Sequence, residues 1–139
     1  MKDVIIFVSS VQDPGKTDEF KTEYEVPGSF DPEGTYSFYY DEPQHLGMGG
    51  SVTTHYEIRP GVATVKREGD VTAEMNFVPG KTVPFCYSIA EGNINMAVRT
   101  KKLDCRLNEH GGSVFIRYGL YAGDKKISDN EITLNIREK

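Results

Sequence analysis

The chain has 139 residues, of which 37% are hydrophobic and 27% charged, and its 16 Lys and Arg against 21 Asp and Glu give a formal net charge of -5. This length predicts a single domain over residues 1–139 that can bury a core without disulfides or a structural metal. A net negative charge removes the electrostatic attraction that dominates nucleic-acid affinity and disfavours anionic membranes, so we expect neither as a partner.

The first apolar segment, Val4–Val8, is too short for a secretory signal, and no stretch approaches the roughly 18 apolar residues of a membrane-spanning helix, so we expect a cytoplasmic protein. The segment that follows, Ser10–Thr17, ends in Gly-Lys-Thr like a phosphate-binding loop. However, it lacks the first glycine of that motif, and Pro14 removes a backbone amide. The tetrapeptide Pro-Gly-Lys-Thr that ends this segment recurs at Pro79–Thr82, and we interpret both copies as type II turns.

Turn signals rich in Gly, Pro and Asp recur at short intervals along the chain, which leaves little room for helices. Between these signals the side chains alternate with period two, the repeat of a strand with one buried face. About ten strands emerge, joined by connections too short for a crossover helix. The clearest stripes are Phe20, Thr22, Tyr24 and Val26; Val71, Ala73, Met75 and Phe77; Ile94, Met96, Val98 and Thr100; Val114, Ile116, Tyr118 and Leu120; and Ile132, Leu134 and Ile136.

Such strands form an antiparallel meander, which must fold over as a sandwich or close into a barrel. We favour closure because hairpin follows hairpin without long returns, and because a closed sheet has no exposed edges. The sequence therefore predicts an all-β fold, a single antiparallel up-and-down β-barrel of about 8–10 strands. The same alternation turns Cys105 inward with Leu103 and Leu107 and turns Cys86 outward, and we expect both thiols to be free.

The sequence shows no catalytic or metal-binding constellation. The three histidines, His45, His55 and His110, lie far apart and lack the spacing of metal ligands. His55 shares a strand face with Glu57, but polar pairs at period two are usual on a solvated face. The chain also lacks a nucleophile elbow and a Cys/His arrangement, so we expect no enzymatic activity, no cofactor and no metal.

The aromatic residues are more informative, since the chain has 8 Tyr and 7 Phe but no Trp. A buried tyrosine hydroxyl needs a partner, which can be another hydroxyl, a trapped water or a polar ligand. Arg67 faces inward if Val65 does, and an inward guanidinium must pair with a protein carboxylate, reach the rim or receive an anionic ligand. The candidate ligand-binding residues are Tyr24, Tyr40, Tyr56, Arg67, Met75, Met96, Thr100 and Tyr118, and Thr54 adds a further hydroxyl to the same interior.

Several of these residues also carry a family resemblance. From Phe20 onward the chain resembles the YwiB-like family of uncharacterised bacterial proteins, a domain of unknown function. The resemblance implies a calycin- or lipocalin-like β-barrel and brings no established activity or catalytic residue. The glycine-rich stretch Gly47–Gly50 departs from the family pattern at one mouth of the barrel. The residues that carry the resemblance are Arg67-Glu68-Gly69, Met75-Asn76-Phe77, Gly80, Tyr87, Gly92, Thr100, Tyr118 and the strand Asn130–Ile136.

Three functions remain open at this point. In the first, the barrel binds a small apolar or amphipathic molecule in its interior, and Gly47–Gly50 is either a lid over the mouth or a plain hairpin loop. In the second, the barrel core is filled, and the protein is an interaction or self-associating module, such as a homodimer, that uses Phe115, Tyr121 and Tyr39 as an outer patch. The third, an enzyme, would require a titratable pair that the sequence does not reveal.

Overall fold

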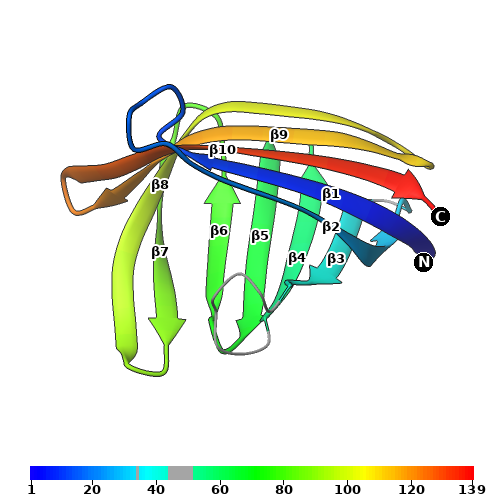
Figure 1. The fold of residues 1–139 in the computed structure, drawn as a ribbon, viewed down its shortest axis with the longest axis horizontal. Coiled ribbons are helices and arrows are strands. Elements are labelled where there is room, and N and C mark those ends of the chain that lie inside the picture. Colours follow the sequence, from blue (N-terminus) through cyan, green and yellow to red (C-terminus); the bar gives the residue numbers. More distant parts are fainter. Residues whose placement is uncertain (34, 44–51) are drawn as a thin grey trace.

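The computed structural model describes residues 1–33, 35–43 and 52–139, and within these ranges the chain forms ten strands and no helix (Figure 1). No helix in this part of the chain could therefore span a membrane. The strands are β1 (Lys2–Gln12), β2 (Phe20–Asp31), β3 (Tyr36–Asp41), β4 (Val52–Arg59), β5 (Val62–Gly69), β6 (Ala73–Phe77), β7 (Thr82–Ile89), β8 (Gly92–Asn108), β9 (Gly111–Ala122) and β10 (Lys125–Glu138).

The strands form one antiparallel sheet in the order β6-β5-β4-β3-β2-β1-β10-β9-β8-β7. Strands that are consecutive in the chain are neighbours in the sheet, except β6 and β7, which lie at its two ends. In the middle of the order β1 pairs with β10 (Figure 1). The end strands meet at an isolated bridge between Thr72 and Ser88, so the sheet curls into a nearly closed barrel. The predicted antiparallel β-barrel is confirmed.

The hydrophobic core occupies the inner face of this barrel. β4 shows the pattern clearly, since every second residue from Val52 to Ile58 is buried and the residues between them are more exposed. β-Branched and aromatic side chains suit such a strand because they pack well on a pleated, half-buried surface. Removing a large apolar side chain from water stabilises the fold by roughly 1.5–3 kcal/mol. The largest fully buried side chains are Phe30, Phe38 and Phe77.

Two β-bulges keep the apolar side chains on the inner face. The register of β8 against β9 shifts between Thr100 and Lys102, so that Thr100 and Leu103 both face inward although they are three residues apart. Without this bulge the alternation would turn Lys102 into the core. As predicted, Cys105 packs against the core, Cys86 is exposed, and both thiols are free. β10 shifts in the same way between Lys126 and Ser128.

The segment that resembles a phosphate-binding loop forms a tight turn. The Lys16 amide donates to the Asp13 carbonyl at 3.2 Å, and Gly15 has a φ of 79°. The second copy has the same geometry, since the Lys81 amide donates to the Val78 carbonyl at 3.0 Å and Gly80 also has a φ of 79°. A positive φ at the third residue of the turn is typical of type II, which confirms the prediction for both copies.

Two apolar residues that were assigned to inner faces are exposed instead. Phe20 has 64% of its surface exposed and Ile94 has 46%. Both lie close to the start of a strand: Phe20 is the first residue of β2, and Ile94 is the third residue of β8. The stripes therefore extend beyond the part of the barrel that other strands cover. Period two correctly predicts on which side of a strand a residue lies, but it does not tell where the covering layer ends.

A first prediction concerns the β8–β9 hairpin. Gly112 has a φ of 135°, and a Cβ atom there would overlap the backbone carbonyl of Arg106 on the neighbouring strand. Gly123 also has a positive φ, 62°, but a Cβ atom there would meet open space. We expect Gly112→Ala to lower the free energy of unfolding by about 3 kcal/mol more than Gly123→Ala, because only Gly112→Ala adds a backbone clash to the strain. Urea unfolding followed by circular dichroism measures the difference, and equal losses would contradict it.

Candidate functional site

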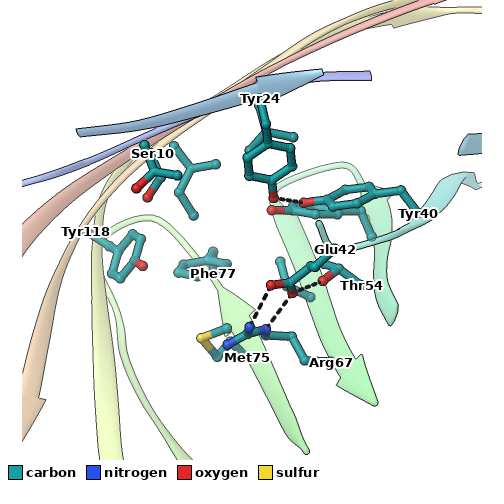
Figure 2. A pocket seen from close by; sticks show the side chains of 14 residues that line it. Ser10, Tyr24, Tyr40, Glu42, Thr54, Arg67, Met75, Phe77 and Tyr118 are labelled. Atoms are coloured by element: carbon teal, nitrogen blue, oxygen red, sulfur yellow. Dashed lines mark hydrogen bonds and ion pairs between the residues drawn. The ribbon is translucent and has the colours of Figure 1, made fainter. Parts of the chain in front are cut away.

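The end of the barrel where β1 finishes holds a pocket of about 310 Å³ (Figure 2). At the start of β1 Val4 and Ile6 are fully buried in the core, whereas Ser10 near its end faces the pocket. Eight strands and the segment after β3 contribute to its wall, so only the folded barrel assembles it. The lining residues are Val8, Ser10, Thr22, Tyr24, Tyr40, Glu42, Thr54, Tyr56, Val65, Arg67, Met75, Phe77, Tyr118 and Ile132.

Most of the residues predicted to bind a ligand meet in this pocket, but two do not. Met96 is half-buried on β8 opposite Phe85 of β7, away from the pocket lining. Thr100 is only 1% exposed and lies in the core beside the pocket, and its hydroxyl has no hydrogen-bond partner among the described residues. The predicted residues that line the pocket are Tyr24, Tyr40, Tyr56, Arg67, Met75 and Tyr118.

Tyrosine side chains form one wall of the pocket. The hydroxyls of Tyr24 and Tyr40 lie 3.4 Å apart, and the ring of Tyr40 lies 6.4 Å from that of Tyr56 (Figure 2). Burial raises the pKa of Tyr24, and it raises the pKa values of Tyr40 and Tyr56 well above the ordinary value. Burial also raises the pKa of Tyr118 to about 12. All four hydroxyls are therefore protonated at neutral pH and can both donate and accept hydrogen bonds.

The charged groups of the pocket form one ion pair. The guanidinium of Arg67 donates to both carboxylate oxygens of Glu42, from Nε at 2.9 Å and from Nη2 at 2.8 Å (Figure 2). The Thr54 hydroxyl donates to the same carboxylate. Although desolvation lowers the pKa of Arg67, the hydrogen bonds and charge of Glu42 outweigh it and leave the pKa raised. The inward guanidinium is thus paired within the protein, one of the arrangements that the sequence allowed, and the pair is neutral overall.

Sequence reasoning did not identify Glu42 as part of the site. Glu42 lies between Asp41 and Pro43, and this sequence is typical of a turn and does not indicate a site residue. In the structure β3 ends at Asp41, and the Glu42 amide donates to the Val52 carbonyl of β4 at 2.8 Å, which holds Glu42 against the barrel. An inward arginine does imply a carboxylate partner, but the sequence offers 21 acidic residues and no means of choosing among them.

Three hydroxyls of the lining make no hydrogen bond to the protein within the described ranges. They belong to Ser10, Thr22 and Tyr118, and Figure 2 shows Ser10 and Tyr118 across the pocket from the Arg67–Glu42 pair. Tyr118 packs its ring on that of Phe77 at a centroid distance of 4.8 Å, which leaves its hydroxyl at the pocket surface. The apolar side chains between these hydroxyls are Val8, Val65, Met75, Phe77 and Ile132.

The histidines and the glycine-rich stretch stand apart from this site. His55 faces outward with its ring 5.0 Å from that of Tyr39, and the exposed His110 lies 3.1 Å from a Glu138 oxygen. His45 and Gly47–Gly50 lie outside the described residues. In the part of the chain that the structure describes, no three His, Cys, Asp or Glu residues come together in a way that could hold a metal ion.

Comparison with known proteins identifies relatives of this chain. A family model described as a domain of unknown function, DUF1934, matches residues 5–134. The uncharacterised β-barrel protein YwiB of Bacillus subtilis is 27% identical over 99 residues, which cover 71% of this chain and 67% of the relative. The crystal structure of the ywiB protein from Bacillus subtilis superposes with a TM-score of 0.86 at 22% identity, over 99% of this chain and 92% of that chain.

A second prediction follows from the buried tyrosines. Tyr56 is 4% exposed and its pKa is raised, so above pH 10 the unfolded chain loses this proton while the folded chain keeps it. The stabilising effect of burying the neutral hydroxyl is complete below pH 10 and decreases as the pH rises toward the folded pKa. In Tyr56→Phe, we expect the free energy of unfolding to fall less steeply between pH 10 and pH 12, by a difference that grows with pH to at most about 1.4 kcal/mol per pH unit. Urea titrations at several pH values measure this slope, and an unchanged slope would contradict the assignment.

Proposed function

The chain belongs to the DUF1934 family, a family of domains of unknown function, and from the geometry of its pocket we propose that it is a non-catalytic barrel that binds a small, neutral, amphipathic molecule. The observation that carries this proposal is a set of hydroxyls, those of Ser10, Thr22 and Tyr118, that have no partner among the described residues and face a pocket of about 310 Å³. The rest of the lining consists of apolar side chains, hydrogen-bonded hydroxyls and one neutral ion pair. A volume of this size lies at the lower end of the range of small-molecule sites. The barrel would thus bind its ligand in the lumen, in the manner of a lipocalin.

The preference for a neutral ligand follows from the electrostatics of the pocket. The Arg67 charge is taken up by Glu42, whose two carboxylate oxygens both accept hydrogen bonds from the guanidinium. The side chains of this pair are only 20% and 13% exposed. A charged ligand would therefore bring a second charge of one sign or the other into a site that is already balanced, and an unpaired buried charge costs several kcal/mol.

The chemistry of the pocket lining supports binding rather than catalysis. Among the described residues that line it there is no histidine or cysteine, and its one carboxylate, Glu42, is held by Arg67 and Thr54. The Ser10 hydroxyl consequently has no general base within this set to activate it. We also place the protein in the cytoplasm, which the free thiols of Cys86 and Cys105 support because reducing compartments keep cysteines unpaired.

The alternative, an interaction module with an outer aromatic patch, has less support. Tyr39 lies on β3 and Phe115 and Tyr121 lie on β9, and β2, β1 and β10 stand between these strands in the sheet. Cationic side chains lie over the ring of Phe115, Lys102 at 5.9 Å and Arg117 at 5.7 Å. The three aromatic rings are thus distributed over separate parts of the surface.

A third prediction tests the pocket with 2-naphthol, a neutral aromatic alcohol whose fluorescence changes when it leaves water. The chain has no tryptophan to interfere with the signal. We expect saturable binding, weakened about five- to tenfold by Tyr118→Phe, because the variant loses one hydrogen bond worth about 1–1.5 kcal/mol. Tyr121→Phe, which removes a hydroxyl that does not line the pocket, is the matched control. Absence of binding to the parent protein, or equal losses in both variants, would rule out this site.

A fourth prediction tests the charge preference with the same ring carrying an anion, 2-naphthoate. The parent protein should bind 2-naphthol more tightly than 2-naphthoate, because Glu42 already neutralises Arg67. In Glu42→Gln the guanidinium loses its partner, and the order of affinity should reverse, with 2-naphthoate gaining about tenfold or more from a charge-assisted hydrogen bond. Fluorescence and calorimetric titrations measure both affinities. An unchanged order in Glu42→Gln would show that the ion pair does not set the ligand charge.

A further inference from the structure

The wall of the barrel is incomplete between β6 and β7. At one end of this seam a turn joins the two strands, and the Gly80 amide in it donates to the Thr100 carbonyl of β8 at 2.9 Å. At the other end Thr72 and Ser88 exchange two backbone hydrogen bonds of 2.9 and 2.8 Å. Between these two ends no ladder joins the described residues of β6 to those of β7.

The sequence explains why the seam stays open. Continuing the pairing set by the turn would place Thr72 opposite Tyr87, but its actual partner is Ser88. β7 therefore has one residue more than β6 between the turn and the bridge, so the strands cannot stay in register along the whole seam. Pro84 lies in this stretch of β7 and has no amide hydrogen to donate to a neighbouring strand.

A groove of about 580 Å³ occupies this seam, and residues from both faces of the sheet line it. Lys66, Glu74 and Cys86 belong to the exposed outer face. Ala73 and Phe85 lie on the inner face, where Ala73 is buried and Phe85 packs against the core. Because neighbouring side chains of a strand point to opposite faces, a groove on the outside of an intact sheet would be lined by one set only. This groove therefore cuts into the wall of the barrel.

The groove and the interior pocket share one residue, Arg67, which lines both. Its guanidinium is turned toward Glu42 on the pocket side (Figure 2). We propose that the seam between β6 and β7 is a lateral entrance through which the ligand reaches the interior pocket. This inference rests on the proposed function, since it requires a ligand in that pocket.

Cys86 provides a way to block the seam chemically. It is exposed in the groove, whereas the other thiol, Cys105, is half-buried and faces inward, and burial raises its pKa to about 11. A maleimide at neutral pH reacts with the thiolate, so Cys86 should be modified selectively. The control is Cys86→Ser combined with Asn135→Cys, which moves the thiol to an exposed position on β10, away from the seam.

The experiment compares 2-naphthol binding by stopped-flow fluorescence before and after a bulky maleimide is attached. Blocking an entrance slows association and dissociation together, so we expect both rates to fall about tenfold while the dissociation constant stays within about twofold. The control protein carrying the same adduct should bind at the parent rate. Unchanged rates at the seam with intact binding would overturn the entrance and leave the proposed function standing.

Two further outcomes would also overturn the inference. Slowing in the control protein as well would show that bulk anywhere on the barrel is sufficient. A large loss of affinity on labelling Cys86 would show that the probe binds in the groove itself. If the unmodified protein binds no 2-naphthol, the proposed function falls and the entrance falls with it.

Discussion

The structure depends on one constraint, which is the alternation of inner and outer side chains on every strand of a nearly closed barrel. A slip of one residue in any strand would exchange the two faces and bring lysines into the core. The bulges after Thr100 and after Lys126 absorb such slips where the sequence contains them. Each absorbs one extra residue, so that Leu103 in β8 and Ser128 in β10 still face inward. The pocket exists because the alternation of inner and outer side chains is maintained on every strand that lines it.

Within that frame the interior divides into two parts of different character. One end is filled by side chains such as Phe30 and Phe38, and the other holds hydroxyls and a single ion pair around a hollow. Polar groups placed inside a barrel lower its stability unless they find partners, and Arg67 and Glu42 do so with each other. Ser10, Thr22 and Tyr118 do not, within the described ranges. These hydroxyls are the groups to which we propose that a ligand donates or from which it accepts hydrogen bonds.

The strands, the faces of their side chains and the turns could be predicted from the sequence because they depend on local rules. Alternation alone predicts that Tyr24, Tyr40 and Tyr118 face the interior. Turn chemistry alone predicts the positive φ of Gly15 and Gly80. The rest depends on contacts between distant segments. Met96 could not be excluded from the lining without knowing where the barrel wall ends, and Glu42 could not be chosen without knowing which acidic residue lies beside Arg67.

The pairing of β1 with β10 has a consequence for how the chain acquires this fold. The first strand finds one of its two neighbours only in the last, with Val4 opposite Glu138 and Gln12 opposite Asn130. During synthesis β1 can pair with β2, but its other edge stays unpaired until β10 has left the ribosome. Contacts so distant along the chain slow folding and leave a strand edge open to aggregation in the meantime.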